Sequence, residues 1–177
     1  MNIFILDSDT EKCARAHCDK HVGKMILESC QLLSTAHHVL DGKEALRGLY
    51  AQTHTNHPCA VWTRETTMNY LWLLSLTKHL SEEFTRRFNK VHLSWRKLCN
   101  LVSQPPRRML VNKTWHMTDH PLCMPDQYKI EGNPVQSYRD YYLHEKKHFA
   151  EWKYSEVPEW WEYLKDSDTS SLRGFPV

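Results

Sequence analysis

Along most of the chain, apolar residues recur every three or four positions, and shorter polar or proline-rich stretches separate these regions. This interval places the apolar side chains on one face of a helix, so the pattern predicts a mainly α protein. We expect helices over about residues 8–40, 60–89, 92–103 and 135–151. A short apolar run at residues 2–6 precedes them as a strand or a buried extended segment.

Local signals mark the two ends of the first long helix. Ser8 and Glu11 have the spacing of a capping box, in which each side chain accepts a hydrogen bond from the other residue's backbone N–H. Asp41-Gly42 is a stop signal, because glycine readily adopts the backbone conformation that ends a helix. We also expect an interruption near Cys18.

The remaining segments are expected to be irregular. Residues 43–57 are polar, and residues 104–134 contain prolines that prevent a long helix (Pro105, Pro106, Pro121, Pro125 and Pro134). Long irregular segments in compact domains often cover a functional site, so we expect residues 104–134 to act as a lid. Residues 152–177 form an aromatic tail. The length of 177 residues predicts one compact helical bundle, a single domain over 1–177.

One face of the first long helix is polar beside apolar neighbours. His17, His21, Lys24 and Glu28 follow one another at intervals of four, three and four residues, which places them on one side of a helix. Because unpaired polar and charged groups are costly to bury, we expect this stripe to face solvent or a cleft. A cleft with these titratable groups would be catalytic, whereas a solvated helix face is the alternative.

Composition and charge narrow the classes of function only slightly. The formal net charge of +2 is a weak basic bias that permits binding to nucleic acid without predicting it. The longest apolar run is too short to span a membrane. Six scattered cysteines without CxxC pairs favour a reducing compartment, so we expect a cytoplasmic protein.

Two sets of residues resemble metal ligands. They are Cys13, His17, Cys18 and His21 in the first set, and His116, His120 and Cys123 in the second. Neither set has the closed spacing of a zinc motif, and an abundance of histidines produces such pairs by chance. We therefore expect no metal and no cofactor.

Further polar residues are candidates for binding a substrate. They are Asn56, His57, Arg64, Asn69, Arg86, Arg87, Trp152 and Lys153. His57 stands where a helix begins, and exposed amides there attract an anion. Basic residues interleaved with aromatic ones suit phosphates and bases. In the alternative interpretation, the aromatic residues belong to the core and the basic residues are ordinary surface residues.

The order of short motifs resembles the pyrimidine-dimer DNA glycosylase family, whose small all-α members are the endonuclease V type of phages. The family has an Asp-x-His followed by a glutamate seven residues after the histidine, matched here by Asp19-Lys20-His21 and Glu28. The later matches are Gly42-Lys43, His57, Arg86-Arg87-Phe88-Asn89, Pro125-Asp126-Gln127-Tyr128-Lys129, Glu145-Lys146 and Trp152-Lys153-Tyr154. This resemblance implies an all-α DNA-repair protein, and a phage protein made in a bacterial host.

The resemblance also implies a mechanism. In the family, the α-amino group of the processed N-terminus attacks C1′ of a damaged nucleotide and forms a Schiff base, and the helix glutamate assists base removal and β-elimination. By position, Glu28 would be the acid/base and His21 its neighbour. His17, Asp19 and Lys20 would contact the substrate. The implied function is a DNA N-glycosylase for a damaged or modified base, with AP-lyase activity.

The chain departs from the family pattern around this site. Position two is Asn2, beside which the initiator methionine is usually retained, so the α-amine would belong to Met1. Lys24 is an alternative amine, and the family's arginines near the glutamate are replaced by Leu27 and Gln31. Without an amine, the glutamate would activate water. The other hypotheses are an N-glycosidase for free nucleotides or nucleosides, a non-catalytic nucleic-acid- or protein-binding module on the same scaffold, and a metal-dependent hydrolase.

Overall fold

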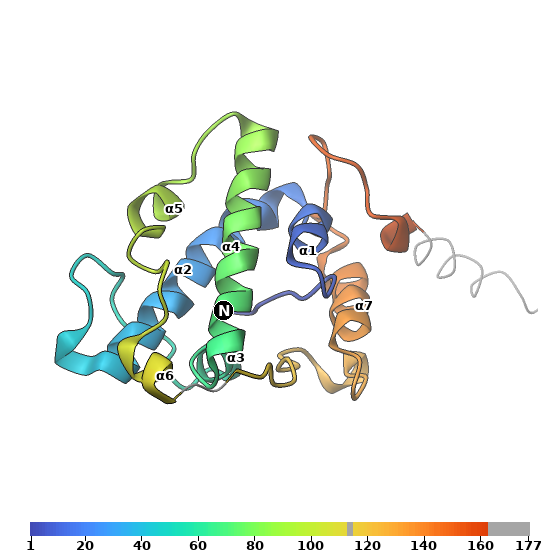
Figure 1. Cartoon of the computed structure of the whole chain (residues 1–177). Coiled ribbons are helices and arrows are strands. Elements are labelled where there is room, and N and C mark those ends of the chain that lie inside the picture. The colour runs from blue at the N-terminus through green and yellow to red at the C-terminus, as the bar shows by residue number, and fades with distance from the viewer. Residues whose placement is uncertain (113–114, 163–177) are drawn as a thin grey trace, which may run out of the picture.

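The computed structural model describes residues 1–112 and 115–162, and within them the chain forms helices joined by turns and extended segments, without a strand (Figure 1). The mainly α prediction is therefore confirmed. The α-helices are α1 (Thr10–Ala16), α2 (Asp19–Asp41), α3 (Pro58–Thr63), α4 (Thr67–Phe88), α5 (Leu93–Leu98), α6 (Arg107–Asn112) and α7 (Pro134–Lys146). Two short 3-10 helices are η1 (Gly42–Glu44) and η2 (Asp126–Tyr128).

The expected first helix is divided into α1 and α2 at the predicted place. His17 ends α1 and Cys18 begins α2, both with extended backbone (ψ of 136° and 161°). Helix α2 ends at Asp41, and Gly42 follows with a φ of 56°, in the region that favours glycine. The interruption near Cys18 and the stop at Asp41-Gly42 are thus confirmed.

The predicted capping box at the start of α1 is wrong. The cap is Asp9, whose carboxylate accepts hydrogen bonds from the backbone N–H groups of Glu11 and Lys12 at 3.0 and 2.9 Å. A carboxylate satisfies two helix amides at once and complements the helix dipole, which favours aspartate over the neighbouring serine.

Other predicted helices are shorter than expected. The segment predicted as one helix over 60–89 is interrupted between α3 and α4, where the Thr66 hydroxyl caps α4 by accepting from the Asn69 N–H. Asn89 ends α4 in a left-handed conformation. Helix α5 ends at Leu98, and α7 ends at Lys146. Within residues 104–134, expected to be irregular, the short α6 begins after a pair of prolines.

Helices α2 and α4 cross at the centre of the molecule, and the other helices pack around them (Figure 1). Gly23 permits the close crossing, because a Cβ there would lie 3.2 Å from the ring of Phe84. Helix α1 packs on α4, and α3, α5 and α6 pack on α2. On the other side, Tyr142 of α7 is fully buried against Trp152 and Trp161 of the aromatic tail. Residues 163–177 of that tail lie outside the described residues.

The N-terminal segment enters the core instead of pairing as a strand. Ile3, Phe4, Ile5 and Leu6 are all buried, between 0% and 6% exposed. The segment runs from α1 toward the middle of the molecule, where the N-terminus is drawn in Figure 1. Burial of these four side chains therefore places Met1 against the core, where it is partly buried.

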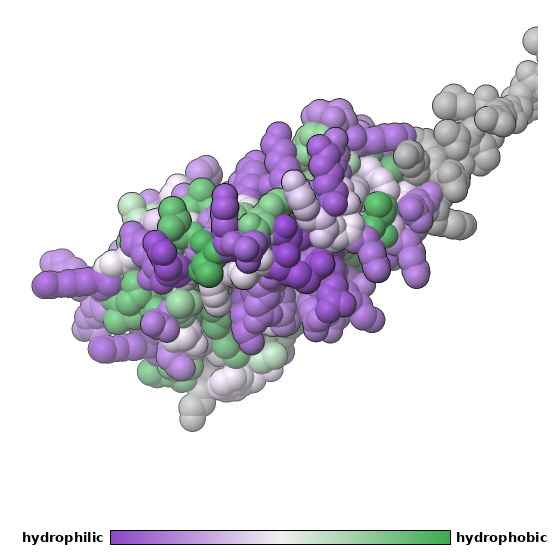
Figure 2. Space-filling view, turned by 90° about the horizontal axis from the view of Figure 1, so that it is seen from above, coloured by the Kyte–Doolittle hydropathy of each residue, from purple (hydrophilic) through white to green (hydrophobic). Residues whose placement is uncertain are grey.

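The face of the molecule seen in Figure 2 is mostly polar. On the face drawn in Figure 2, hydrophilic residues predominate and apolar residues form scattered patches. Among the described residues, none of the helices combines the length and the apolar character needed to cross a membrane.

Candidate functional site

The α-amine of Met1 lies against the carboxylate of Glu28. The nitrogen is 3.8 Å from Oε2, and the Nζ of Lys24 is 3.5 Å from Oε1 of the same carboxylate. The side chain of Glu28 is 16% exposed and that of Lys24 is 58% exposed. The carboxylate thus lies between two amines, one held near the core and one in solvent.

Two contacts fix the backbone that carries the Met1 amine. The side-chain amide of Asn2 donates to the carbonyl of Cys123 at 2.7 Å. The backbone N–H of Ile3 donates to Sγ of Cys59 at 3.4 Å. With the buried residues that follow, these bonds determine where the first residue lies.

His57 lies beside this amine and carboxylate. It caps α3, and its Nδ1 accepts from the backbone N–H of Cys59 at 3.2 Å. Burial and the positive charge at Met1 lower the pKa of His57, and the negative charge of Glu28 opposes that shift. Since the usual pKa of histidine is about 6.5, His57 is neutral at pH 7. The predicted residues Met1, Lys24, Glu28 and His57 are therefore brought together.

Cys59 and Cys123 complete the group. Cys59 was not predicted as a site residue, and Cys123 was considered only as a metal ligand together with His116 and His120. Their sulfurs are 3.6 Å apart, although the residues are 64 positions apart in the sequence. With Cys59 as the donor, this hydrogen bond raises the pKa of Cys59, as burial also does, and lowers that of Cys123 to about 7. The spacing His57-x-Cys59 could have pointed to the first cysteine, but the second comes from the irregular segment and only the fold brings it here.

The two metal-ligand sets considered in the sequence do not gather three ligands in the described part of the chain. His17 donates through Nδ1 to the carbonyl of Cys13 at 2.7 Å, so that bond is to backbone. His116 is exposed, and Nε2 of the buried His120 lies 3.4 Å from the carbonyl of Ile3. One group of three does occur among the described residues: ligand atoms of His57, Cys59 and Cys123 lie within 4.8 Å of one another.

The expected stripe of four polar residues on one helix face is divided. His17 lies at the end of α1, and it and His21 are buried, 0% and 3% exposed. Burial lowers the pKa of His17 to about 4 and that of His21 to about 3. The expectation that both would avoid the core was wrong, because a neutral imidazole packs against rings, as His21 does on Phe4 with centroids 4.9 Å apart.

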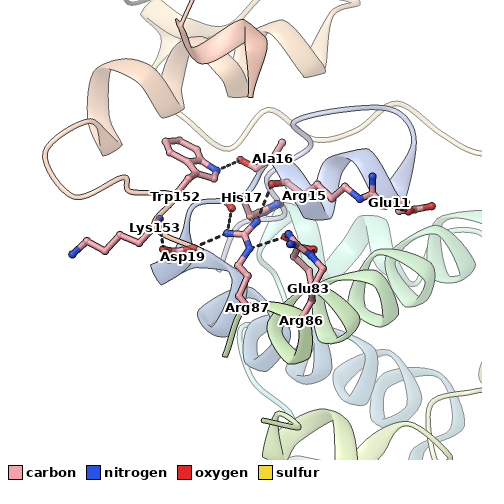
Figure 3. Close-up of polar contacts among 10 residues, drawn as sticks. All are labelled: Glu11, Arg15, Ala16, His17, Asp19, Glu83, Arg86, Arg87, Trp152 and Lys153. Atoms are coloured by element: carbon pink, nitrogen blue, oxygen red, sulfur yellow. Dashed lines mark hydrogen bonds and ion pairs between the residues drawn. The ribbon is translucent and has the colours of Figure 1, made fainter. Parts of the chain in front are cut away.

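Several other predicted residues gather in a separate network around Arg87 (Figure 3). The Arg87 side chain is fully buried and donates to Glu83 at 2.7 Å and to Asp19 at 2.9 Å. It also donates to the carbonyls of His17 and Arg15 at 2.8 and 2.9 Å. All of these partners are protein groups, so the guanidinium ties α1, α2 and α4 together.

The aromatic tail joins the same network (Figure 3). The backbone N–H of Lys153 donates to Asp19 Oδ2 at 2.8 Å, and Trp152 Nε1 donates to the carbonyl of Ala16 at 3.3 Å. Arg86 is 55% exposed and bonds to Glu83 on the outer side. This network contains none of the residues around Glu28.

The remaining predicted residues have other surroundings. The buried side-chain amide of Asn69 donates to Thr118 Oγ1 at 2.7 Å and accepts from the Thr118 N–H at 3.0 Å, which fixes the irregular segment to α4. Arg64 is half-buried at the end of α3, and Asn56 is exposed directly before His57. Lys20 lies over the ring of Phe149, 4.6 Å from its centroid.

An open hollow of about 960 Å³ lies between α1 and the tail. Its charged lining consists of Lys12, Arg15, Arg86, Arg139, Asp7, Glu156 and Glu159. It shares no lining residue with the group around Met1 and Glu28. Because cations and carboxylates both line the hollow, its lining favours neither an anionic nor a cationic ligand.

The fold and the site together define a small, mainly α protein in which an amine is paired with a candidate acid/base. The chain belongs to the pyrimidine dimer DNA glycosylase family, whose sequence model matches residues 1–97. No curated protein and no solved structure matches the chain. The matched residues include Met1, Glu28, His57 and Cys59, whereas Cys123 lies beyond them. Membership in a glycosylase family implies DNA as the substrate.

Proposed function

We propose that this chain is a DNA N-glycosylase that removes a damaged or modified base and has AP-lyase activity. Met1 supplies the nucleophilic α-amine, and Glu28 is the acid/base. The observation that carries the proposal is the 3.8 Å separation between the Met1 nitrogen and the Glu28 carboxylate. Because the wider family acts on DNA, this pairing has a direct chemical interpretation.

The chemistry requires both groups at one sugar. The neutral amine attacks C1′, the base leaves with a proton, and the opened sugar remains bound to nitrogen as an imine. A carboxylate beside C1′ stabilises the positive charge that develops on the sugar. The same carboxylate can then accept the C2′ proton, after which the 3′ phosphate leaves by β-elimination.

Met1 is favoured over Lys24 as the nucleophile because its position is constrained. The contacts of Asn2 and Ile3 hold its backbone, whereas Lys24 is 58% exposed on a flexible stem. A nucleophile held in place loses less entropy on reaching the reactive geometry. Lys24 remains the alternative amine, at the other oxygen of the same carboxylate.

The target nucleotide has to leave the duplex to reach this site. Two exposed apolar side chains are close in sequence to residues of the site. Leu27 directly precedes Glu28 and is 39% exposed, and Val61 lies one helical turn after His57 and is 43% exposed. Apolar side chains commonly fill the space between unstacked bases. We propose this role for Leu27 and Val61.

The test is borohydride trapping with abasic and UV-irradiated duplex DNA, followed by peptide mapping of the adduct. Intact mass and N-terminal sequencing first establish that Met1 carries the free amine. An adduct on Met1 supports the proposal, and an adduct on Lys24 assigns the nucleophile there instead. No adduct, when a known lyase is trapped in parallel, overturns the imine mechanism.

One observation favours the second candidate, an N-glycosidase for free nucleotides or nucleosides. Leu27 and Gln31 stand near Glu28, where cations would contact a DNA backbone. In that case Glu28 would activate water, and duplex DNA would bind without strong dependence on salt. For either candidate we propose a cytoplasmic protein, which the free thiols favour. The family resemblance alone leads us to propose a phage protein acting in a bacterial host.

A further inference from the structure

We propose that His57, Cys59 and Cys123 form a binding site for a thiophilic divalent cation of the zinc class. The three ligand atoms lie within 4.8 Å of one another, and they come from the start of α3 and from the irregular segment before η2. This inference does not rest on the proposed DNA chemistry. The two ligand sets considered in the sequence contain neither His57 nor Cys59.

The distances suit tetrahedral coordination. Two sulfurs that share a zinc ion at about 2.3 Å each are about 3.8 Å apart, close to the 3.6 Å between Cys59 and Cys123. A sulfur and an imidazole nitrogen on such an ion are about 3.6 Å apart, so the imidazole would have to approach by at most about 1.2 Å. Rotation of a half-buried side chain is sufficient for that movement.

The chemistry of the donors selects the class of ion. Two thiolates and an imidazole are soft or intermediate ligands, which suit zinc and disfavour magnesium and calcium. Both cysteines are free thiols, and only Cys59 is buried, so an ion has access from the Cys123 side. If Nδ1 of His57 is the ligand, its bond to the ion replaces the 3.2 Å hydrogen bond from the Cys59 N–H.

The groups around the ligands are already fixed by further contacts. The Ile3 N–H donates to Cys59 Sγ, and the Tyr138 hydroxyl accepts from the Cys123 N–H at 3.2 Å and donates to the carbonyl of Pro121 at 2.8 Å. Partners of this kind orient metal ligands and raise affinity. Because Asn2 also binds the Cys123 carbonyl, an ion here would fasten the N-terminal segment to α3 and to the irregular segment.

Three protein ligands leave a fourth position for water or a substrate atom. His57 experiences the charges of both Met1 and Glu28, so the three ligand residues belong to the same part of the molecule as the amine and the carboxylate. The complex of a divalent ion with two thiolates and a neutral imidazole has no net charge. The ion would therefore affect the amine mainly by fixing the position of the N-terminal segment, and much less through long-range electrostatics.

The experiment uses the full chain, reduced under anaerobic conditions, and titrates it with Co²⁺ and then Zn²⁺. We expect thiolate-to-cobalt absorption that saturates at one equivalent and is displaced by zinc, together with a zinc-dependent rise in Tm. Cys123→Ser should lose the absorption, and His57→Gln should weaken cobalt binding at least tenfold. Cys99→Ser is the matched control, since Cys99 is half-buried and lies outside the group.

Two results would overturn the site. One is the absence of cobalt absorption in the reduced wild-type protein, with all thiols titrated as free. The other is unchanged absorption in Cys123→Ser, whose folding circular dichroism would verify. Neither readout uses DNA, so loss of glycosylase activity and loss of metal binding are scored separately.

Discussion

The α-amine of Met1 and the carboxylate of Glu28 are neighbours at 3.8 Å because the first residues of the chain are buried. Helix α2 brings the carboxylate from one direction, and the extended segment brings the amine from another. Such a pair depends on tertiary packing, since no periodic pattern relates an extended terminus to a position within a helix. The proposed chemistry therefore depends on the core as well as on the reacting groups.

Replacing Glu28 with glutamine should lower single-turnover base release and strand cleavage by about 10²–10⁴-fold. Glutamine preserves the size of the side chain but neither takes a proton nor stabilises positive charge on the sugar. Glu82→Gln is the matched control, because Glu82 is exposed on α4, where it pairs with the exposed Lys78. Equal rates for Glu28→Gln and the wild-type protein would instead favour the non-catalytic binding module.

Extending the chain by Gly-Ser before Met1 should abolish borohydride trapping. Two added residues move the amine by up to about 7 Å, beyond reach of a sugar that contacts the carboxylate. Lys24→Gln should keep the adduct, since it removes only the exposed amine. Mass spectrometry of the trapped complexes measures both. If trapping survives the extension and is lost in Lys24→Gln, the nucleophile is Lys24 and not the Met1 amine.

The sequence predicted several of the residues that the structure brings together. Glu28, Lys24 and His57 were identified from helical spacing and from the start of a helix, and Met1 from the family resemblance. Cys123 could not be placed, because its partners are distant in sequence and the irregular segment has no periodic signal. His17 and His21 were misjudged since neutral imidazoles were treated as if they were charged.

The periodicity of apolar residues predicted that most of these segments are helical and roughly where they lie. The residues at which each helix begins and ends depended on local chemistry. The break before α2 and the stop at Gly42 were predictable. The break between α3 and α4 was not, because the apolar residues on its two sides, Val61 and Met68, keep the spacing of one continuous helix and the Thr66 cap has no distinctive spacing. Asp9 displaced the predicted Ser8 cap through the stronger acceptor.

Arg87→Met should lower the free energy of unfolding by about 3–5 kcal/mol, because it leaves the largely buried carboxylates of Glu83 and Asp19 with fewer partners. Arg86→Met is the matched control on the adjacent, exposed position and should cost about 1 kcal/mol or less. Urea denaturation measures both. Similar losses for the two variants would show that the buried network does not determine stability at this junction.

Affinity for abasic duplex DNA should fall steeply with salt if DNA is the substrate. Each phosphate contact adds about −0.9 to the slope of log K against log salt concentration, so three contacts give about −2.7. Fluorescence anisotropy of a labelled duplex at several salt concentrations measures this slope. A slope near zero, combined with saturable binding of a free nucleotide, would favour the second candidate function.

Stability should decline as the pH falls from about 6.5 toward 4. Burial lowers the pKa of His17 and His120 to about 4 and that of His21 to about 3. The unfolded chain therefore takes up protons below pH 6.5 while the folded chain does not, and each histidine contributes a slope of up to about 1.4 kcal/mol per pH unit. Above about pH 6.5 these histidines are neutral in both the folded and the unfolded chain, so they no longer lower the stability.

Urea denaturation at pH 7.5, 6.0 and 5.0 measures that slope, and His21→Phe tests its origin. Phenylalanine keeps a ring beside Phe4 and Tyr142 but does not titrate. The slope of the free energy of unfolding against pH should therefore decrease by the contribution of one histidine. His116→Gln is the control, since His116 is exposed and its removal should leave the slope unchanged. A slope that is the same in all three proteins would mean that protonation of His21 does not limit stability in acid, and the carboxylates of the Arg87 network would then be the groups to examine.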